Sequence, residues 1–321
     1  MALWNRYSIF PARVGDLLLR QIGSADLRSA TNKSEVTPGG AVDRSAVITA
    51  YADPMSTFKT PDFGVMTGAT FISLLTGYIF DTTAEVATAS TLLQLQQRLD
   101  GGLFTGAGAN ILLTSQKGFA AVTDISASQD DPAGAAISID VWHLSTDGLT
   151  IPVVATFSQN LTSTPAYNGF WYLGPIFIGD PAGSPFRLRG VQRVTINPGL
   201  QYTVKRADGN PFAAIGSIVR RNPEIRVTLS DPQQLYASGI GGMSLFGKAI
   251  TAGIRIACYF QAGLHGGQRV DEGTAAHYRF TAQTGDMQVD QVSVQENDDA
   301  TVDLVVRPTG TLTLAALNII P

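Results

Sequence analysis

An internal repeat constrains the fold of this chain more than any other feature of its sequence. Leu113–Ala127 aligns with Phe280–Val294 at an offset of 167 positions, with five identities in 15 positions, where ordinary composition gives about one by chance. Both copies continue into an acidic turn and then into a strand-like segment. The repeat predicts two structural units of the same design. The identical pairs are Thr114 and Thr281, Gln116 and Gln283, Gly118 and Gly285, Val122 and Val289, and Ser126 and Ser293.

A pair of long hairpins is expected at a similar spacing. In Leu19–Asp62, apolar-alternating arms at Leu19–Leu27 and Ala46–Phe58 flank a polar middle that holds Pro38-Gly39-Gly40, the pattern of a β-hairpin with an oversized loop. Leu188–Asp231 follows the same plan 169 positions later, with five identities in 44 positions against about three by chance. Because the two repeated blocks occur in the same order at nearly equal offsets, we interpret the chain as a tandem duplication.

The duplication also decides between two interpretations of one local segment. Thr82–Leu99 has a capping box at Thr82 and Glu85 and a leucine face, which predicts a helix. The repeat instead aligns Leu92–Gly102 with Ile256–Gly267, which alternates as a strand does. Because tertiary context routinely overrides propensity, we expect a strand over Leu92–Gln96.

The rest of the pattern predicts a mainly β protein with at most a short helix in each half. A short helix after Pro61 and then a strand are expected within Asp62–Phe80. Past residue 103, short apolar runs are separated by turn-forming residues, which is typical of strands. We expect two tandem β-barrel or sandwich domains, each with a long β-hairpin arm. Their boundaries are an N-terminal arm at 1–16 that docks on a neighbour or across its own barrel, a first domain at 17–160, a linker at 161–169 and a second domain at 170–321.

Composition and charge narrow the partners of such a protein. Charged residues make up 15% of the chain and the formal net charge is −4, which disfavours a basic nucleic-acid reader or a binder of anionic membranes. A sparsely charged surface suits a subunit that is buried in an assembly. Cys258 is the single cysteine, so no disulfide forms within the chain. The N-terminus lacks a signal-peptide pattern, and we expect synthesis and retention in a cytoplasm until assembly.

Motifs for catalysis, cofactors and metals are not recognised in the sequence. The three histidines, His143, His265 and His277, do not have zinc-ligand spacing, and we interpret His143 as structural. The acidic pairs Asp130-Asp131 and Asp298-Asp299 offer oxygen ligands for calcium, but a solvated turn is the preferred interpretation. The second hairpin is the more basic one, and we expect its arginines to pair with acidic turns of another protomer. We therefore expect no enzyme activity, no cofactor and no metal site.

The chain resembles the tail tube (major tail) proteins of long-tailed, non-contractile bacteriophages. The resemblance rests on the hairpin with its Pro/Gly loop (Leu19–Phe58), the apolar segment after Asp62, and barrel strands that end in an acidic turn and a last strand. The most tube-like part is the end of the second copy, HYRFTAQTGDMQVDQVSVQENDDATVDLVVRPTG, from His277 to Gly310. Here the family pattern is duplicated within one chain.

The resemblance implies a virion structural protein. Proteins of that family form stacked rings around a channel for DNA, and a duplicated subunit gives trimeric rings of pseudo-sixfold symmetry. The implied partners are other copies of the chain, further tail proteins at the tube ends, and DNA that passes without specific binding; no membrane is implied. The implied location is the virion tail, assembled in the host cytoplasm. Long hairpin loops reach the neighbouring ring in that family, so we expect inter-ring contacts at 28–46 and 197–215, in particular at Thr37, Pro38, Gly39, Gly40, Arg206, Asp208, Gly209 and Asn210.

Two alternatives stay open from the sequence. Another virion component, such as a tail-tip hub or a capsid-associated protein, has the same β-rich and weakly charged composition. A carbohydrate-binding or hydrolytic β-domain is suggested by Trp142, Trp171 and the acidic turns. A glycosidase needs two carboxylates that face each other across a cleft, and Asp140 and Asp303 are the candidates.

Overall fold

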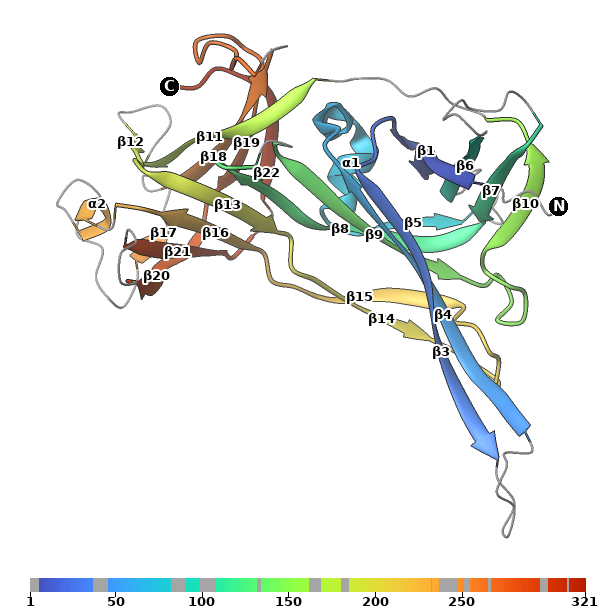
Figure 1. Cartoon of the computed structure of the whole chain (residues 1–321). Helices are drawn as coiled ribbons and strands as arrows, with labels where there is room; N and C mark the ends of the chain where they lie inside the picture. Colours follow the sequence, from blue (N-terminus) through green and yellow to red (C-terminus); the bar gives the residue numbers. More distant parts are fainter. Residues whose placement is uncertain are drawn as a thin grey trace.

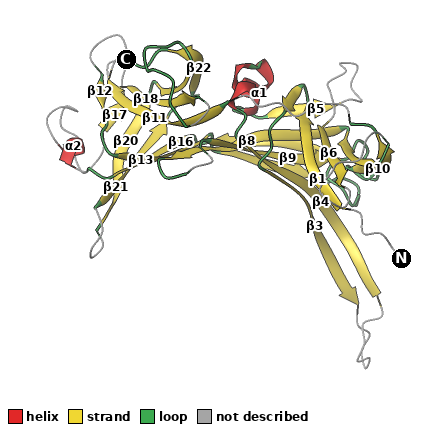
Figure 2. Cartoon of the chain, turned by 45° about the horizontal axis from the view of Figure 1, so that its top comes forward, coloured by secondary structure: helices red, strands yellow, loops and turns green. Residues whose placement is uncertain are grey.

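The computed structural model describes residues 6–36, 46–81, 91–98, 108–131, 134–161, 169–179, 185–231, 233–236, 248–250, 255–264, 267–294, 300–310 and 312–321. The described chain is mainly β, which confirms the predicted fold class at that level. A ten-stranded antiparallel sheet runs through both halves of the chain (Figure 1). Each half adds a five-stranded sheet, and these two smaller sheets and α1 lie on the same side of the large one (Figure 2).

The first half supplies one small sheet and part of the large sheet. The small sheet has the order β10-β7-β6-β1-β2, and the large sheet runs β8-β9-β4-β3 with β5 paired to β8. The elements are β1 (Arg6–Val14), β2 (Leu17–Leu19), β3 (Ser24–Val36), β4 (Ala46–Thr60), η1 (Phe63–Thr67), α1 (Ala69–Leu74), β5 (Tyr78–Asp81), β6 (Thr91–Arg98), β7 (Asn110–Ser115), β8 (Lys117–Ser128), β9 (Ala136–Leu144) and β10 (Val154–Gln159).

The second half repeats this arrangement strand for strand. Its small sheet has the order β22-β19-β18-β11-β12 and its part of the large sheet runs β17-β20-β21-β16-β13. The elements are β11 (Phe170–Gly179), β12 (Phe186–Arg187), β13 (Val191–Asn197), β14 (Leu200–Lys205), β15 (Ile215–Arg221), β16 (Glu224–Leu229), α2 (Gln233–Tyr236), β17 (Lys248–Ile250), β18 (Arg255–Gly263), β19 (His277–Ala282), β20 (Gly285–Ser293), β21 (Thr301–Pro308) and β22 (Thr313–Asn318).

The two long hairpins have the same length, register and bulge position. The first is β3–β4 and the second is β13–β14 with β15–β16. The register shifts between Asn32 and Lys33 in the first hairpin and between Gln201 and Tyr202 in the second, which is 169 positions later. Equal registers are found at both ends of the hairpins: Ser24↔Lys59 matches Arg193↔Thr228, and Val36↔Ala46 matches Lys205↔Ile215.

The second repeated block also keeps its irregularities. In the β8–β9 pair the register shifts between Val122 and Asp124, and in the β20–β21 pair it shifts between Val289 and Gln291, 167 positions later. A β-bulge is a specific local feature that twists and bends a strand pair. Its recurrence at the offset found in the sequence supports the duplication independently of residue identity.

Several local expectations are settled by the structure. The short helix after Pro61 is confirmed as η1 and α1, followed by strand β5. The strand over Leu92–Gln96 is confirmed, because β6 pairs with β1 and β7; residues 82–90, with the capping box, lie outside the described residues. The helix propensity of this segment is overridden because its backbone is hydrogen-bonded to a strand on each side within the sheet.

Two boundaries differ from the expectation. Residues 6–14, within the expected N-terminal arm, form β1 in the first half's small sheet between β2 and β6. The first arm of the hairpin is Ser24–Val36 rather than Leu19–Leu27, and Leu17–Leu19 is a separate strand. The polar residues from Arg28 onward were expected in the loop, but backbone pairing to β4 carries them into the strand although Arg28 and Ser29 bury little surface. The expected linker is described only at 161 and 169.

One apolar core spans the two halves. Alternation along the strands of the large sheet places residues such as Ile137, Ile139 and Val227 on the face that meets the small sheets. Phe63 of η1 is fully buried among aromatic rings of the second half, with ring centroids 5.1 Å from Phe260 and 6.0 Å from Trp171. We call the opposite face of the large sheet the open face.

Candidate functional site

The junction between the halves is a strand pairing, and we take it as the centre of the candidate site. β13 of the second half pairs antiparallel with β8 of the first half over four residue pairs, from Arg193↔Ser128 to Ile196↔Ile125. The backbone N–H of Gln129 extends the ladder by donating to the carbonyl of Gln192 at 2.8 Å. Ile125 and Ile196 are fully buried at this joint. The repeated halves are thus fused edge to edge into one sheet.

The large sheet has open strand edges at both ends of the molecule. Within the described residues, β3 pairs only with β4 on one edge. β20 pairs with β17 over Gly285–Met287, and beyond that point its described pairing is with β21 alone. Leu27 on β3 is 38% exposed and Val292 on β20 is 49% exposed. Exposed apolar residues on unpaired edges are typical of surfaces that pair with another strand.

The outer part of the second hairpin, β14–β15, lies on the open face of the first half. Tyr202 packs on Trp142, with ring centroids 3.6 Å apart, and on Phe119 at 5.6 Å. Ile218 packs against the same cluster. Gly77 fits under this contact because a Cβ there would lie 2.3 Å from Ile218 Cδ1, and its φ of +92° also favours glycine. Packing of Tyr202 and Ile218 over the buried rings of Phe119 and Trp142 holds the hairpin on the first half.

The predicted contact residues of the second hairpin lie at its tip, and part of the tip touches the first half of the same chain. Arg206 forms an ion pair with Asp53 and stacks over the ring of Tyr51, with its guanidinium carbon 4.1 Å from the centroid. Asn210 Nδ2 donates to the carbonyl of Asp147 at 3.2 Å. Asp208 and Gly209 form an exposed turn at positive φ. Thr37, Pro38, Gly39 and Gly40 lie outside the described residues.

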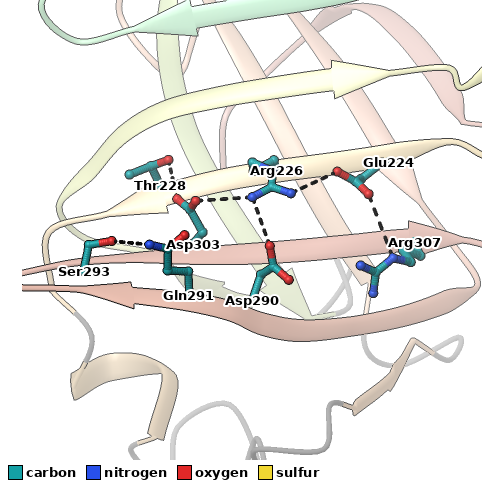
Figure 3. Close-up of polar contacts among 8 residues, drawn as sticks. All are labelled: Glu224, Arg226, Thr228, Asp290, Gln291, Ser293, Asp303 and Arg307. Carbon is teal, nitrogen blue, oxygen red and sulfur yellow. Dashed lines mark hydrogen bonds and ion pairs between the residues drawn. The ribbon is translucent and has the colours of Figure 1, made fainter.

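A polar cluster covers the open face of the second half (Figure 3). Arg226 on β16 lies 3.1 Å from a carboxylate oxygen of Asp290 and 3.3 Å from one of Asp303. Glu224 lies 3.5 Å from Arg226 and 3.9 Å from Arg307. Burial of Arg226 lowers its pKa, but the hydrogen bond that it donates to Asp290 and the charges of the nearby carboxylates outweigh that effect and raise the pKa. Two arginines face three carboxylates, which leaves the cluster with a net charge of −1.

The groups suggested for sugar binding or hydrolysis are engaged in packing and hydrogen bonding. Trp142 is 6% exposed under Tyr202, and Trp171 packs edge-on against Tyr278 at 4.6 Å. Asp140 accepts a hydrogen bond from Thr57 Oγ1 at 2.8 Å, while burial raises its pKa. Asp303 belongs to the Arg226 cluster. Asp140 and Asp303 are thus each held by contacts within their own half, and both tryptophan rings are packed against tyrosines.

His143 forms a buried pair with Ser56. Its Nε2 lies 2.7 Å from Ser56 Oγ, and both residues are less than 5% exposed. Nδ1 has no hydrogen-bond partner among the described residues. Burial lowers the pKa of His143 from 6.5 to about 4, so the imidazole is neutral in the folded chain at neutral pH. Inaccessibility to a substrate supports the structural interpretation of this histidine.

The buried imidazole predicts a pH-dependent stability. Because the unfolded chain binds a proton at His143 below pH 6.5 and the folded chain binds it only near pH 4, its contribution is complete above pH 6.5 and is lost as the pH falls toward 4. We expect His143→Gln to reduce the difference in unfolding free energy between pH 7 and pH 4 by about 3 kcal/mol. Urea unfolding of the wild-type protein and of His143→Gln between pH 4 and pH 7 measures this difference. If the unfolding free energies of the two proteins changed in parallel with pH, the assignment to His143 would be contradicted.

No protein-family model and no curated protein matches this chain. The candidate site is therefore argued from the strand pairings and exposed edges of this chain alone.

Among the described helices, none is long and apolar enough to cross a membrane. Three or more acidic, histidine or cysteine side chains do not gather into a possible metal site anywhere in the described ranges. Asp130 and Asp131 are exposed, and 295–299, with the second acidic turn, lie outside the described residues.

The pairing of β13 with β8 was not predicted from the sequence. It joins residues nearly 70 positions apart, and neither strand carries a motif that names its partner. The available signal was the apolar alternation that the paired segments share, at Ile125 and Ala127 in β8 and at Val194 and Ile196 in β13. Such a pattern predicts strands but does not predict which edges meet.

Proposed function

We propose that this protein is a structural component of a bacteriophage tail tube. In this proposal the two halves are tandem tail-tube-like β domains, and three chains close a ring with six quasi-equivalent positions. Rings then stack into a tube that conducts DNA during ejection. The location would be the virion tail, and the partners would be other copies of the chain and further tail proteins at the tube ends.

One observation carries most of the proposal. The halves repeat the same strand order, register and bulges, and they meet by pairing β13 with β8. A repeated unit that joins its neighbour edge to edge forms a closed ring when the rotation between units closes the circle, and an open helical filament when it does not. Ring closure would also cover the exposed edges of β3 and β20, which are a liability for a free monomer.

The open face is suited to a conduit for DNA. Cationic side chains bind phosphates along a duplex cumulatively, so a lumen with free arginines would hold the DNA. At the Arg226 cluster the arginines are instead compensated by Asp290, Asp303 and Glu224. We infer that such a face, if it lines the channel, binds the duplex weakly and allows it to move.

The hairpins supply candidate contacts between rings. In the second hairpin, Asp208 and Gly209 are exposed and Arg206 and Asn210 orient the tip through contacts to the first half. For the first hairpin, the proposal concerns Thr37 to Gly40. Removal of residues 37–41 is expected to leave rings intact and to stop their stacking, and tubes of unchanged length in electron micrographs would oppose this role.

Electron microscopy of the purified protein tests the proposal. Negative-stain images are expected to show rings or tubes with a central hole, and tubes should shorten as ionic strength or dilution weakens the contacts between rings. Small particles that never stack would instead favour the alternative of a tail-tip hub or another virion component. A protein that remains a monomer at high concentration would contradict both.

A further inference from the structure

We propose that the strand edge of β3 at Ala25–Leu27 pairs with Val292–Val294 of a second copy of this chain, at the end of β20. The register would be that of the β13–β8 junction inside one chain. The inference deepens the proposed function, since it names the surface that closes the ring. It stands on the internal repeat, because each of these edges is the counterpart of one partner in that junction.

The counterparts follow from the matched registers. Subtracting 169 positions from β13 places Ile196 at Leu27 and Val194 at Ala25. Adding 167 positions to β8 places Ile125 at Val292 and Ala127 at Val294. Within one chain Ile196 pairs with Ile125 and Val194 with Ala127. The expected pairs between chains are therefore Leu27 with Val292, Asp26 with Ser293, and Ala25 with Val294.

The apolar residues of the junction are buried, whereas most of their counterparts at the proposed interface are exposed in the single chain. This difference is expected for a contact that forms only in the assembly. Ile196, Val194 and Ile125 are fully buried in the junction. Their counterparts Leu27 and Val292 are exposed, whereas Ala25, the counterpart of Val194, is partly buried. Val294, the counterpart of the buried Ala127, is 73% exposed. All four apolar positions of the junction point to the core side of the sheet, so pairing in the same register would bring Leu27, Val292 and Val294 onto the core side of a continuous sheet.

A second contact of the junction also has counterpart residues in the repeat. Inside the chain, the backbone N–H of Ala135 donates to the carbonyl of Trp171 at 2.6 Å. In the repeat, β9 corresponds to β21 and β1 corresponds to β11. Their registers make Ala300 the counterpart of Ala135 and Tyr7 the counterpart of Trp171. Tyr7 is 37% exposed. The same docking movement would therefore satisfy two separated contacts, which an arbitrary partner strand would not do.

The occupant is a second copy because the two edges complement each other and lie at opposite ends of one sheet (Figure 1). A head-to-tail contact of this kind leaves one free edge at each end of the oligomer until the ring closes. With two of six positions in each chain, closure takes three chains. A strand from another protein would leave the matching edge of every chain exposed.

Disulfide trapping tests the register. A chain with both Leu27→Cys and Val292→Cys is oxidised after assembly and run on a denaturing gel without reductant. Paired residues in antiparallel strands have Cα atoms about 4.5–5.5 Å apart, which is within the range for a disulfide. Cys258 does not compete, because it is buried and burial raises its pKa to about 12. We expect covalent oligomers that end at three chains.

The matched control is Leu27→Cys with Ser293→Cys, which shifts the register by one residue and places the thiols on opposite faces. We expect about tenfold less cross-linked product from the control, because opposite-facing thiols exceed disulfide geometry. Ala25→Cys with Val294→Cys is a second in-register pair should the first variant fold poorly. Equal yields from control and in-register pairs, or rings in micrographs without any cross-link from either in-register pair, would overturn the interface. Cross-linked trimers without stacked tubes would preserve the interface and overturn the tail-tube function.

Discussion

Replacement of Ile125 by aspartate is expected to abolish cooperative folding of the chain near neutral pH. Ile125 is fully buried where β8 pairs with Ile196 of β13, and its side chain belongs to the apolar core cluster. Losing the buried side chain and burying an unpaired charge together cost at least about 4 kcal/mol, a large part of the roughly 5–15 kcal/mol that stabilises a folded domain.

Urea unfolding followed by circular dichroism measures this effect. Ile125→Val is the matched control, and we expect it to reduce the unfolding free energy by about 1 kcal/mol. A folded Ile125→Asp chain with near-wild-type stability would show that the junction does not hold the halves together.

Replacement of Val292 by aspartate is expected to leave the folded monomer stable and to prevent its assembly. Val292 is the counterpart of Ile125 in the second half, but it lies on an exposed edge. The folded monomer should change in stability by no more than about 0.5 kcal/mol, as is usual for exposed sites. Assembly should fail, because the proposed pairing with Leu27 would bury the new carboxylate without a partner.

Sedimentation velocity beside urea unfolding separates the two effects for Val292→Asp. We expect a monomer with an unchanged unfolding midpoint, and Val292→Thr, which keeps the β-branched shape, should retain assembly in part. Intact rings of Val292→Asp would show that this edge faces solvent in the assembly.

The repeat could be recognised in the sequence at positions where the backbone geometry accepts only one type of residue. Gly118 and Gly285 are identical because a Cβ at either position would meet the carbonyl oxygen of the paired strand, Trp142 O at 2.5 Å or Arg307 O at 2.3 Å. The hairpins retain little identity because strand pairing at an exposed arm needs only alternation and backbone hydrogen bonds. The weak hairpin alignment was nevertheless correct to the residue, since both bulges occur at the predicted offset.

The sequence could not predict which strand pairs with each strand edge or which elements meet through long-range contacts. Arg28 and its polar neighbours were expected in a loop, since local pattern gives no sign of a strand that pairs on one edge without burying a face. Residues 6–14 were expected as an arm, although their counterpart Phe170–Ile178 was recognised as a strand. The docking of Tyr202 on Trp142 depends on the placement of β14–β15 over the first half, which is a long-range contact.

The mass of the smallest closed assembly tests most directly whether one chain supplies two of six positions in a ring. Native mass spectrometry of the wild-type protein should give a species of three chains, three times 34.0 kDa or about 102 kDa, with stacked forms in multiples of three. A ring of six chains, or a stable monomer at the concentrations used for microscopy, would contradict the pseudo-sixfold arrangement.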